Sequence, residues 1–213
     1  MPVVRSIEQQ RGGTALVGVD DADPVELPLE ALLEHNIHKG RLLEPDRWKT
    51  IQFEGRHRIA VRRALTFLAR RRRTAAELST HLSANFTEAE TRRAIERVAE
   101  LGYLDDGAWA RAYLAQPRSR GRGRSMLTRE LQAKGIGAQD LETALDTHDE
   151  TEEAIAAARK RARALRRLEA DVRQRRLYAY MARRGFKHET IKHAVSVVDG
   201  ESQPVESVLA RPR

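Results

Sequence analysis

Apolar residues recur at helical spacing along most of the chain. Val61, Ala64, Leu65 and Leu68, for example, stand at positions i, i+3, i+4 and i+7 and define one helix face. The pattern predicts an all-α body with helices over residues 56–70, 75–83, 88–101, 106–116, 124–134, 138–147, 150–166, 169–184 and 188–199. Most of these helices are too short to persist alone in water, so packing between them must stabilise the fold.

Residues that favour helix ends support these boundaries. Thr74 with Glu77, and Thr87 with Glu90, have the spacing of a capping box, in which each side chain bonds the other residue's backbone N–H. Gly102 suits the left-handed conformation in which helices often end.

An internal repeat runs through the helical region. Phe86, Ile136 and Phe186 are each 50 residues apart. The helices that follow them have matching inward positions: Thr91, Ala94, Ile95 and Val98; Leu141, Ala144, Leu145 and His148; Ile191, Ala194, Val195 and Val198. The repeat predicts three tandem three-helix units, over residues 55–104, 105–149 and 150–199, stacked in an elongated curved array.

The first 54 residues lie outside this repeat. Residues 1–12 are polar and are expected to be loose, whereas Gly13–Val19 and Pro24–Leu27 indicate a β-hairpin and Leu29–Asn36 a short helix. Glu44-Pro45-Asp46 indicates the start of a further helix, because proline is tolerated in the first turn. We expect residues 1–54 to be an extension that the repeats do not need, so that a chain starting near Arg56 still folds. Residues 200–213 are expected to be a disordered tail.

Charge narrows the class of partner. The chain has 39 basic and 31 acidic residues and a net charge of +8, and 33 of the basic residues are arginine. Arginine's planar fork suits phosphate and carboxylate, so a polyanionic partner is expected. The chain has no cysteine, no apolar run of membrane-spanning length and no apolar signal core at its start. These features favour a cytoplasmic protein without membrane contact.

Three basic clusters are candidate DNA- or filament-binding sites. Four arginines alternate in a glycine-containing loop, four more form a run at a predicted helix end, and three have helical spacing. These residues are Arg118, Arg120, Arg122 and Arg124; Arg70, Arg71, Arg72 and Arg73; and Arg159, Arg163 and Arg167. We expect the loop to be mobile and open to phosphate, and reversal of charge at Arg120, Arg122 and Arg124 to leave the fold intact. The last cluster is equally consistent with a solvated helix face paired with Glu152 and Glu153.

Catalytic chemistry has no matching motif. The sequence lacks a phosphate-binding glycine loop followed by Lys-Ser/Thr, and its seven histidines are scattered. Asp105 and Asp106 are better explained as a helix cap. No catalytic residue, metal site or cofactor is therefore expected. Trp109 and Tyr113 have core spacing, and exposed aromatic residues for base stacking are not expected, so nucleic-acid contacts should be independent of sequence.

One stretch closely resembles the signature of the RecX family of bacterial recombination regulators. It comprises the Gly-Tyr-Leu-Asp-Asp turn at 102–106, the aromatic-Ala-x-x-aromatic helix at 109–113, the Arg/Gly loop at 118–124, and Glu-Leu-x-x-Lys-Gly-Ile at 130–136. The resemblance extends more loosely from about residue 13 to about residue 199. It implies tandem three-helix repeats behind a small β-hairpin and a linker helix.

The resemblance also implies a function. RecX proteins negatively regulate the RecA recombinase by binding its nucleoprotein filament, in the groove or at an end, and limit filament extension, ATP hydrolysis and strand exchange. The expected partners are thus the RecA filament and single- or double-stranded DNA, bound by a monomer that is not an enzyme. The sequence alone leaves two alternatives: a sequence-specific helical transcription regulator, and a scaffold protein with no role on DNA.

Overall fold

The computed structural model describes residues 1–20 and 22–201. The chain divides into two compact units, one over Met1–Asp105 and one from Asp106 onward. The predicted tail begins inside the last helix, and its residues 202–213 lie outside the described part of the chain.

The first unit begins with a three-stranded antiparallel sheet of β1 (Val4–Gln10), β2 (Thr14–Val19) and β3 (Val25–Pro28), in that order. The hairpin predicted for the second and third strands is confirmed. The prediction that residues 1–12 are loose is wrong, because β1 pairs with β2 along its length. Most side chains of β1 are polar because the strand lies at the sheet edge with one face in solvent, which hides the apolar alternation.

A short helix, α1 (Leu29–Glu34), is followed by a helix of 26 residues, α2 (Pro45–Arg70). The separate start predicted at residue 56 is wrong, because one helix runs through that position. The start indicated by Glu44-Pro45-Asp46 is confirmed as that of α2, where the Glu44 carboxylate accepts from the backbone N–H groups of Asp46 and Arg47. The helix passes through Gly55 without a break. A Cβ atom there would lie 2.6 Å from a methyl carbon of Leu27, so the glycine lets the sheet pack closely on α2.

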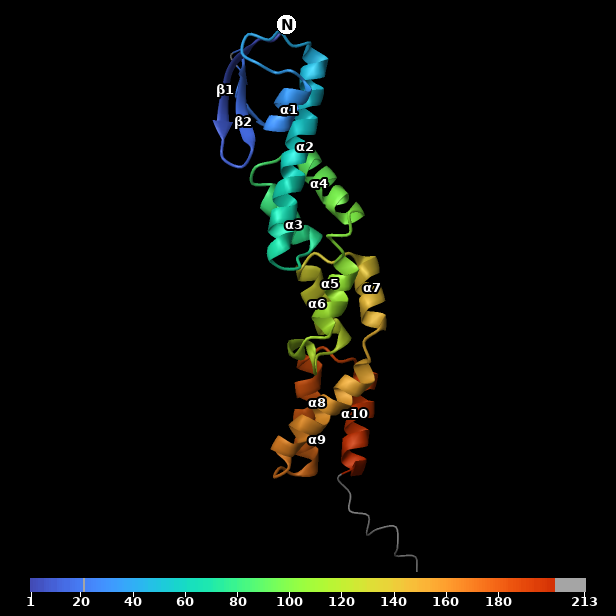
Figure 1. Cartoon of the computed structure of the whole chain (residues 1–213). Helices are drawn as coiled ribbons and strands as arrows, with labels where there is room; N and C mark the ends of the chain where they lie inside the picture. Colours follow the sequence, from blue (N-terminus) through green and yellow to red (C-terminus); the bar gives the residue numbers. More distant parts are fainter. Residues whose placement is uncertain (21, 202–213) are drawn as a thin grey trace, which may run out of the picture. The chain divides into compact units, whose positions relative to one another are not determined.

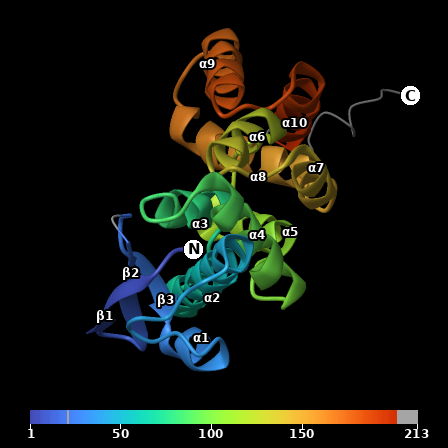
Figure 2. The same cartoon turned by 90° about the horizontal axis from the view of Figure 1, so that it is seen from above.

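Helix α2 contributes residues to two hydrophobic cores. Its ribbon runs beside the sheet and beside the next two helices (Figures 1 and 2). Its first half places Trp48 and Ile51 against the sheet. Its second half places Ile59, Ala60 and Ala64 against α3 (Ala75–Leu82) and α4 (Glu88–Glu100). The sheet and the first three-helix repeat therefore share one continuous element.

Both predicted caps are present in this unit. The Thr74 hydroxyl accepts from the backbone N–H of Glu77 at 3.2 Å. Thr87 and Glu90 form a complete capping box. The Glu90 carboxylate also binds the guanidinium of Arg56, at 2.5 Å from Nε, and so ties α4 to α2.

The second unit contains the other two repeats. The first of these consists of α5 (Asp106–Leu114), α6 (Arg124–Ala133) and α7 (Ala138–Asp146), and a short 3-10 helix, η1 (Pro117–Ser119), lies between α5 and α6. The last repeat consists of α8 (Glu150–Leu165), α9 (Ala170–Arg183) and α10 (His188–Glu201), whose helices pack on one another (Figure 1). Each repeat has its own hydrophobic core.

The predicted repeat register is confirmed at most positions. Phe86, Ile136 and Phe186 are all buried, as are the alanines at the second inward position of each set. Leu145 and Val195 are buried, but their counterpart Ile95 is only partly buried. Ile95 lines an open pocket between α3 and α4, so the first repeat is less tightly closed at this position.

Candidate nucleic-acid interface

The Arg/Gly loop lies between α5 and α6 of the second repeat and contacts the third repeat. Ser119 is fully buried, and its hydroxyl donates to the Tyr113 carbonyl at 2.7 Å. The backbone N–H of Gly121 donates to the Glu153 carboxylate, and the N–H of Gly123 donates to the Arg184 carbonyl at 2.8 Å. The expectation of a mobile, open loop is therefore wrong, because its backbone donors bind groups of the third repeat and not a phosphate.

The four loop arginines have different environments. Arg122 pairs with the Glu130 carboxylate at 2.5 Å, and its side chain is 25% exposed. Arg124, the first residue of α6, contacts carboxylates of α7 at 2.7 and 3.1 Å. Arg118 is exposed and its guanidinium lies over the Tyr113 ring, whereas Arg120 is exposed and lines a pocket. Arg118 and Arg120 are therefore the loop arginines most open to a partner.

The pocket beside Arg120 combines this arginine with cations that the sequence analysis missed. Lys160 of α8 and Arg184, which follows the end of α9, also line it, and the Arg184 guanidinium lies over the Tyr180 ring. The carboxylate of Glu153 lies in the same pocket and accepts from Gly121. Lys160 and Arg184 are far from Arg120 in the sequence, so only folding brings the three cations together.

The electrostatics of the loop centre on Glu130. Its carboxylate accepts hydrogen bonds from both the Tyr113 hydroxyl and Arg122. Burial of Tyr113, reinforced by the bond to this carboxylate, raises the pKa of its phenol above the ordinary value. Tyr113 therefore remains a neutral donor that holds Glu130 in place for Arg122.

The run of four arginines follows the end of α2. Arg71 and Arg73 both lie near the Glu77 carboxylate, at 3.5 and 3.8 Å, and Arg73 also lies over the Phe67 ring. Arg72 is exposed, and Arg70 lines a pocket beside the sheet. The run therefore divides, since two arginines support the start of α3 and two face solvent or the pocket.

The third cluster opens onto a groove of about 440 Å³ in the last repeat. Arg159 and Arg163 line it from α8, but Arg167 follows the end of that helix and is not among the lining residues. The predicted three-residue stripe on one helix face is therefore wrong at Arg167. Arg166 and Arg173 complete the cluster instead, and Asp199 of α10 pairs with Arg173 at 3.7 Å.

Sequence reasoning missed Arg166 and Arg173 for different reasons. Arg166 caps the end of α8 and falls outside the i, i+4 spacing that selected its neighbours. Arg173 belongs to α9 and reaches the groove only through helix packing. Glu153, one alternative partner of this cluster, accepts from the backbone N–H of Gly121.

Exposed aromatic rings are present, contrary to the expectation from the sequence. Tyr103 is 63% exposed, and Tyr178 and Phe53 are also partly open to solvent. Within residues 1–20 and 22–201, no group of three or more His, Cys, Asp or Glu side chains has the geometry of a metal site. In the same residues no helix is both long and apolar enough to span a membrane.

Comparison with known proteins identifies relatives over nearly the whole chain. A family model described as the RecX third three-helix domain matches residues 148–195, which is the last repeat. "Regulatory protein RecX" of Chlorobaculum tepidum is 33% identical over 150 residues, which cover 70% of this chain and 93% of that protein. "Regulatory protein RecX" of Bacillus subtilis is 27% identical over 209 residues, covering 95% of this chain and 79% of that one.

A solved structure supports the fold. The crystal structure of a regulatory protein RecX aligns with a TM-score of 0.67 at 21% identity, covering 92% of this chain and all of that one. The helical repeats and the small sheet are thus a known arrangement. Together with the relative that is one-third identical over most of its length, these findings place the chain in a family: it belongs to the RecX regulatory proteins.

Proposed function

We propose that this chain negatively regulates the RecA recombinase by binding the RecA–DNA filament, in its groove or at its end. Bound there, it limits filament extension, ATP hydrolysis and strand exchange during recombination and DNA repair. It acts as a cytoplasmic monomer without catalytic activity or cofactor. Support for this proposal comes from membership of a family whose relatives are named as RecX regulatory proteins.

The observation that carries the proposal is the groove of the last repeat. Four arginines line it, namely Arg159, Arg163, Arg166 and Arg173, and Asp199 is the one carboxylate among its lining residues. Such a surplus of positive charge on a concave surface favours a polyanion. Guanidinium groups bind phosphate oxygens with two parallel hydrogen bonds, which suits a nucleic-acid backbone.

Arg118 and Arg120 extend the proposed contact surface within the same unit. Both are exposed, and neither has an ion pair among the described residues. Contacts of this kind with phosphates release counterions and carry no sequence information. Binding to DNA alone is thus expected to be weak, independent of sequence and strongly reduced by salt.

The test is RecA ATP hydrolysis on single-stranded DNA with increasing amounts of the purified chain. Wild-type protein is expected to inhibit hydrolysis. Arg163→Glu/Arg166→Glu removes two groove cations that have no hydrogen bond or ion pair within the described residues, and should weaken inhibition at least about tenfold. Arg176→Glu/Arg183→Glu is the matched control, since it makes the same charge change at exposed positions of α9 outside the groove.

Two outcomes would contradict the proposal. No inhibition by wild-type chain at any concentration would remove the recombinase as the target. Equal loss of inhibition in the groove variant and the control would remove the groove as the contact site. Strong preference for one duplex sequence would instead favour the alternative of a transcription regulator.

A further inference from the structure

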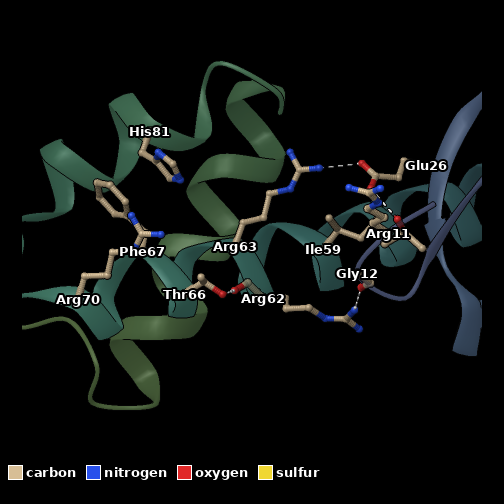
Figure 3. Close-up of a pocket in the computed structure, with 11 residues that line it drawn as sticks. Arg11, Gly12, Glu26, Ile59, Arg62, Arg63, Thr66, Phe67, Arg70 and His81 are labelled. Carbon is tan, nitrogen blue, oxygen red and sulfur yellow. Dashed lines mark hydrogen bonds and ion pairs between the residues drawn. The ribbon is translucent and has the colours of Figure 1, made fainter.

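A second basic pocket belongs to the first unit, whereas the groove of the last repeat belongs to the second unit. The pocket has a volume of about 380 Å³. One face of α2 forms its floor, through Ile59, Arg62, Arg63, Thr66, Phe67 and Arg70. Figure 3 shows the turn between β1 and β2, with Arg11 and Gly12, at one end, and Phe67 and His81 at the other.

The charge of this pocket is strongly positive. Four arginines line it, against the single carboxylate of Glu26. Arg63 pairs with Glu26 at 2.9 Å. Arg62 donates to the Gly12 carbonyl at 3.0 Å and pairs with Glu30 at 3.6 Å. Arg11 and Arg70 are exposed, and neither side chain has a hydrogen bond or ion pair within the described residues. These two arginines are therefore open to an anion.

An aromatic stack borders the same pocket. The rings of Phe67 and His81 are parallel, with centroids 4.0 Å apart. The Arg73 guanidinium lies 3.9 Å from the centre of the Phe67 ring. His81 and Arg73 are both too close to this ring to share one of its faces, so they lie on opposite faces. Phe67 is therefore covered on both faces. His81 is exposed and stacks by one face only, which leaves its other face for a further planar group.

We propose that this pocket binds a nucleotide unit, with phosphate at the arginines and the base on the His81 ring. Arg62 and Arg70 are eight residues apart on α2, or about 12 Å along the helix, so one ligand can reach cations at both ends. Aromatic rings stack on any base, and guanidinium groups bind its phosphates. The pocket volume falls within the usual range for small-ligand sites.

Two sources supply this chemistry: a free nucleotide or a segment of single-stranded nucleic acid. Four probes distinguish them by direct binding: ATP, octathymidylate, an abasic oligomer with the same number of phosphates, and an octaglutamate peptide. The Arg163→Glu/Arg166→Glu background removes cations of the groove in the other unit, so that the pocket dominates binding. These measurements need no recombinase, so their outcome is separate from that of the proposed regulatory function.

Octathymidylate is expected to bind at least about fivefold more tightly than the abasic oligomer. Arg11→Glu/Arg70→Glu should weaken binding of octathymidylate at least about tenfold. The matched control is Arg47→Glu/Arg92→Glu, which makes the same charge change at exposed positions of the first unit outside the pocket, and should weaken it less than about threefold. If ATP binds with the same dependence on Arg11 and Arg70, the pocket is a site for a free nucleotide. If octathymidylate binds and ATP does not, the pocket is a site for a single strand.

His81→Ala separates base recognition from phosphate recognition. Alanine keeps the helix, so this variant should retain binding of the abasic oligomer while losing the preference for octathymidylate. If the chain that retains His81 bound the abasic oligomer as tightly as octathymidylate, the proposal would be overturned. Binding of octaglutamate as tight as that of octathymidylate would overturn it as well. So would a pocket variant that binds octathymidylate no more weakly than its charge-matched control.

Discussion

Gly123 and Gly185 bring the backbones of the second and third repeats into direct contact. A Cβ atom on Gly123 would lie 2.3 Å from the carbonyl carbon of Gly185, and one on Gly185 would lie 2.5 Å from the backbone nitrogen of Met126. Backbone hydrogen bonds run from Gly123 to Arg184 and from Ser125 to Gly185. The two glycines therefore hold the Arg/Gly loop against the last repeat.

Gly123→Ala should destabilise the second unit by about 1–3 kcal/mol, because the added methyl group meets backbone atoms that cannot rotate away. Urea denaturation followed by circular dichroism measures this loss. Gly200→Ala is the control, since a Cβ atom there has no heavy atom within 4 Å and the residue lies in α10. Its stability should stay equal or rise slightly. A Gly123→Ala chain as stable as wild type would contradict this account of the contact.

Charge reversal in the loop should separate structural arginines from exposed ones. Arg122→Glu places a carboxylate beside Glu130, and Arg124→Glu places one beside Glu142 and Asp146, so each should cost about 1–2 kcal/mol of stability. Arg120→Glu should leave the melting temperature unchanged, because Arg120 is exposed.

This prediction differs from the expectation from the sequence, in which all three charge reversals leave the fold intact. Thermal melts of the three single variants provide the measurement. Unchanged melting of Arg122→Glu and Arg124→Glu would show that their ion pairs contribute nothing to the fold. The recombinase assay on Arg120→Glu then reports on function alone, since its stability is unaffected.

Removing residues 1–55 should destabilise the first repeat, contrary to the expectation from the sequence. The cut divides α2 and removes the sheet that packs on it. It also removes the carboxylate partners of Arg58, Arg62 and Arg63 on α1 and the sheet. We expect a loss of roughly 2 kcal/mol or more, measured as reduced cooperativity and a lower melting temperature. A truncated chain that melts like the full one would restore the original expectation.

The sequence predicted the helices well because their signals are local. Capping residues such as Thr87 and helix-ending glycines such as Gly102 act within a few residues of their own position. The boundary predicted between residues 54 and 55 rested on where the repeat begins, but α2 runs through it without a break. Only the neighbouring Leu27, distant in sequence, explains why a glycine lies inside that helix.

The candidate sites were predicted less well because arginine pairing depends on packing. Arg122 and Glu130 are eight residues apart and meet only after the loop folds back. Arg173 enters the groove from another helix, and His81 reaches the Arg11 pocket from α3. Charge density along the sequence identifies basic segments, but it does not show which cations remain open to a partner.

The last prediction concerns His57 on α2. Burial, followed by the nearby charges of Arg93 and Arg97, lowers the pKa of its ring below the ordinary value of 6.5. Its Nδ1 atom is buried and has no hydrogen-bond partner among the described residues, which also disfavours the charged form. The neutral ring therefore fits the folded state better than the imidazolium does.

Because the folded pKa of His57 lies below its unfolded value, the unfolded chain binds more protons as the pH falls through 6.5. The stability that His57 contributes is thus fully present above this pH and is lost below it, down to the folded pKa. His57→Gln should flatten the fall in stability of the first unit between pH 7.5 and 5.5, whereas His38→Gln, at an exposed position, should not. Denaturation midpoints of the three chains across this range provide the measurement. Equal pH dependence in wild type and His57→Gln would show that the imidazolium is accommodated in the fold, and the buried position of His57 would then need another explanation.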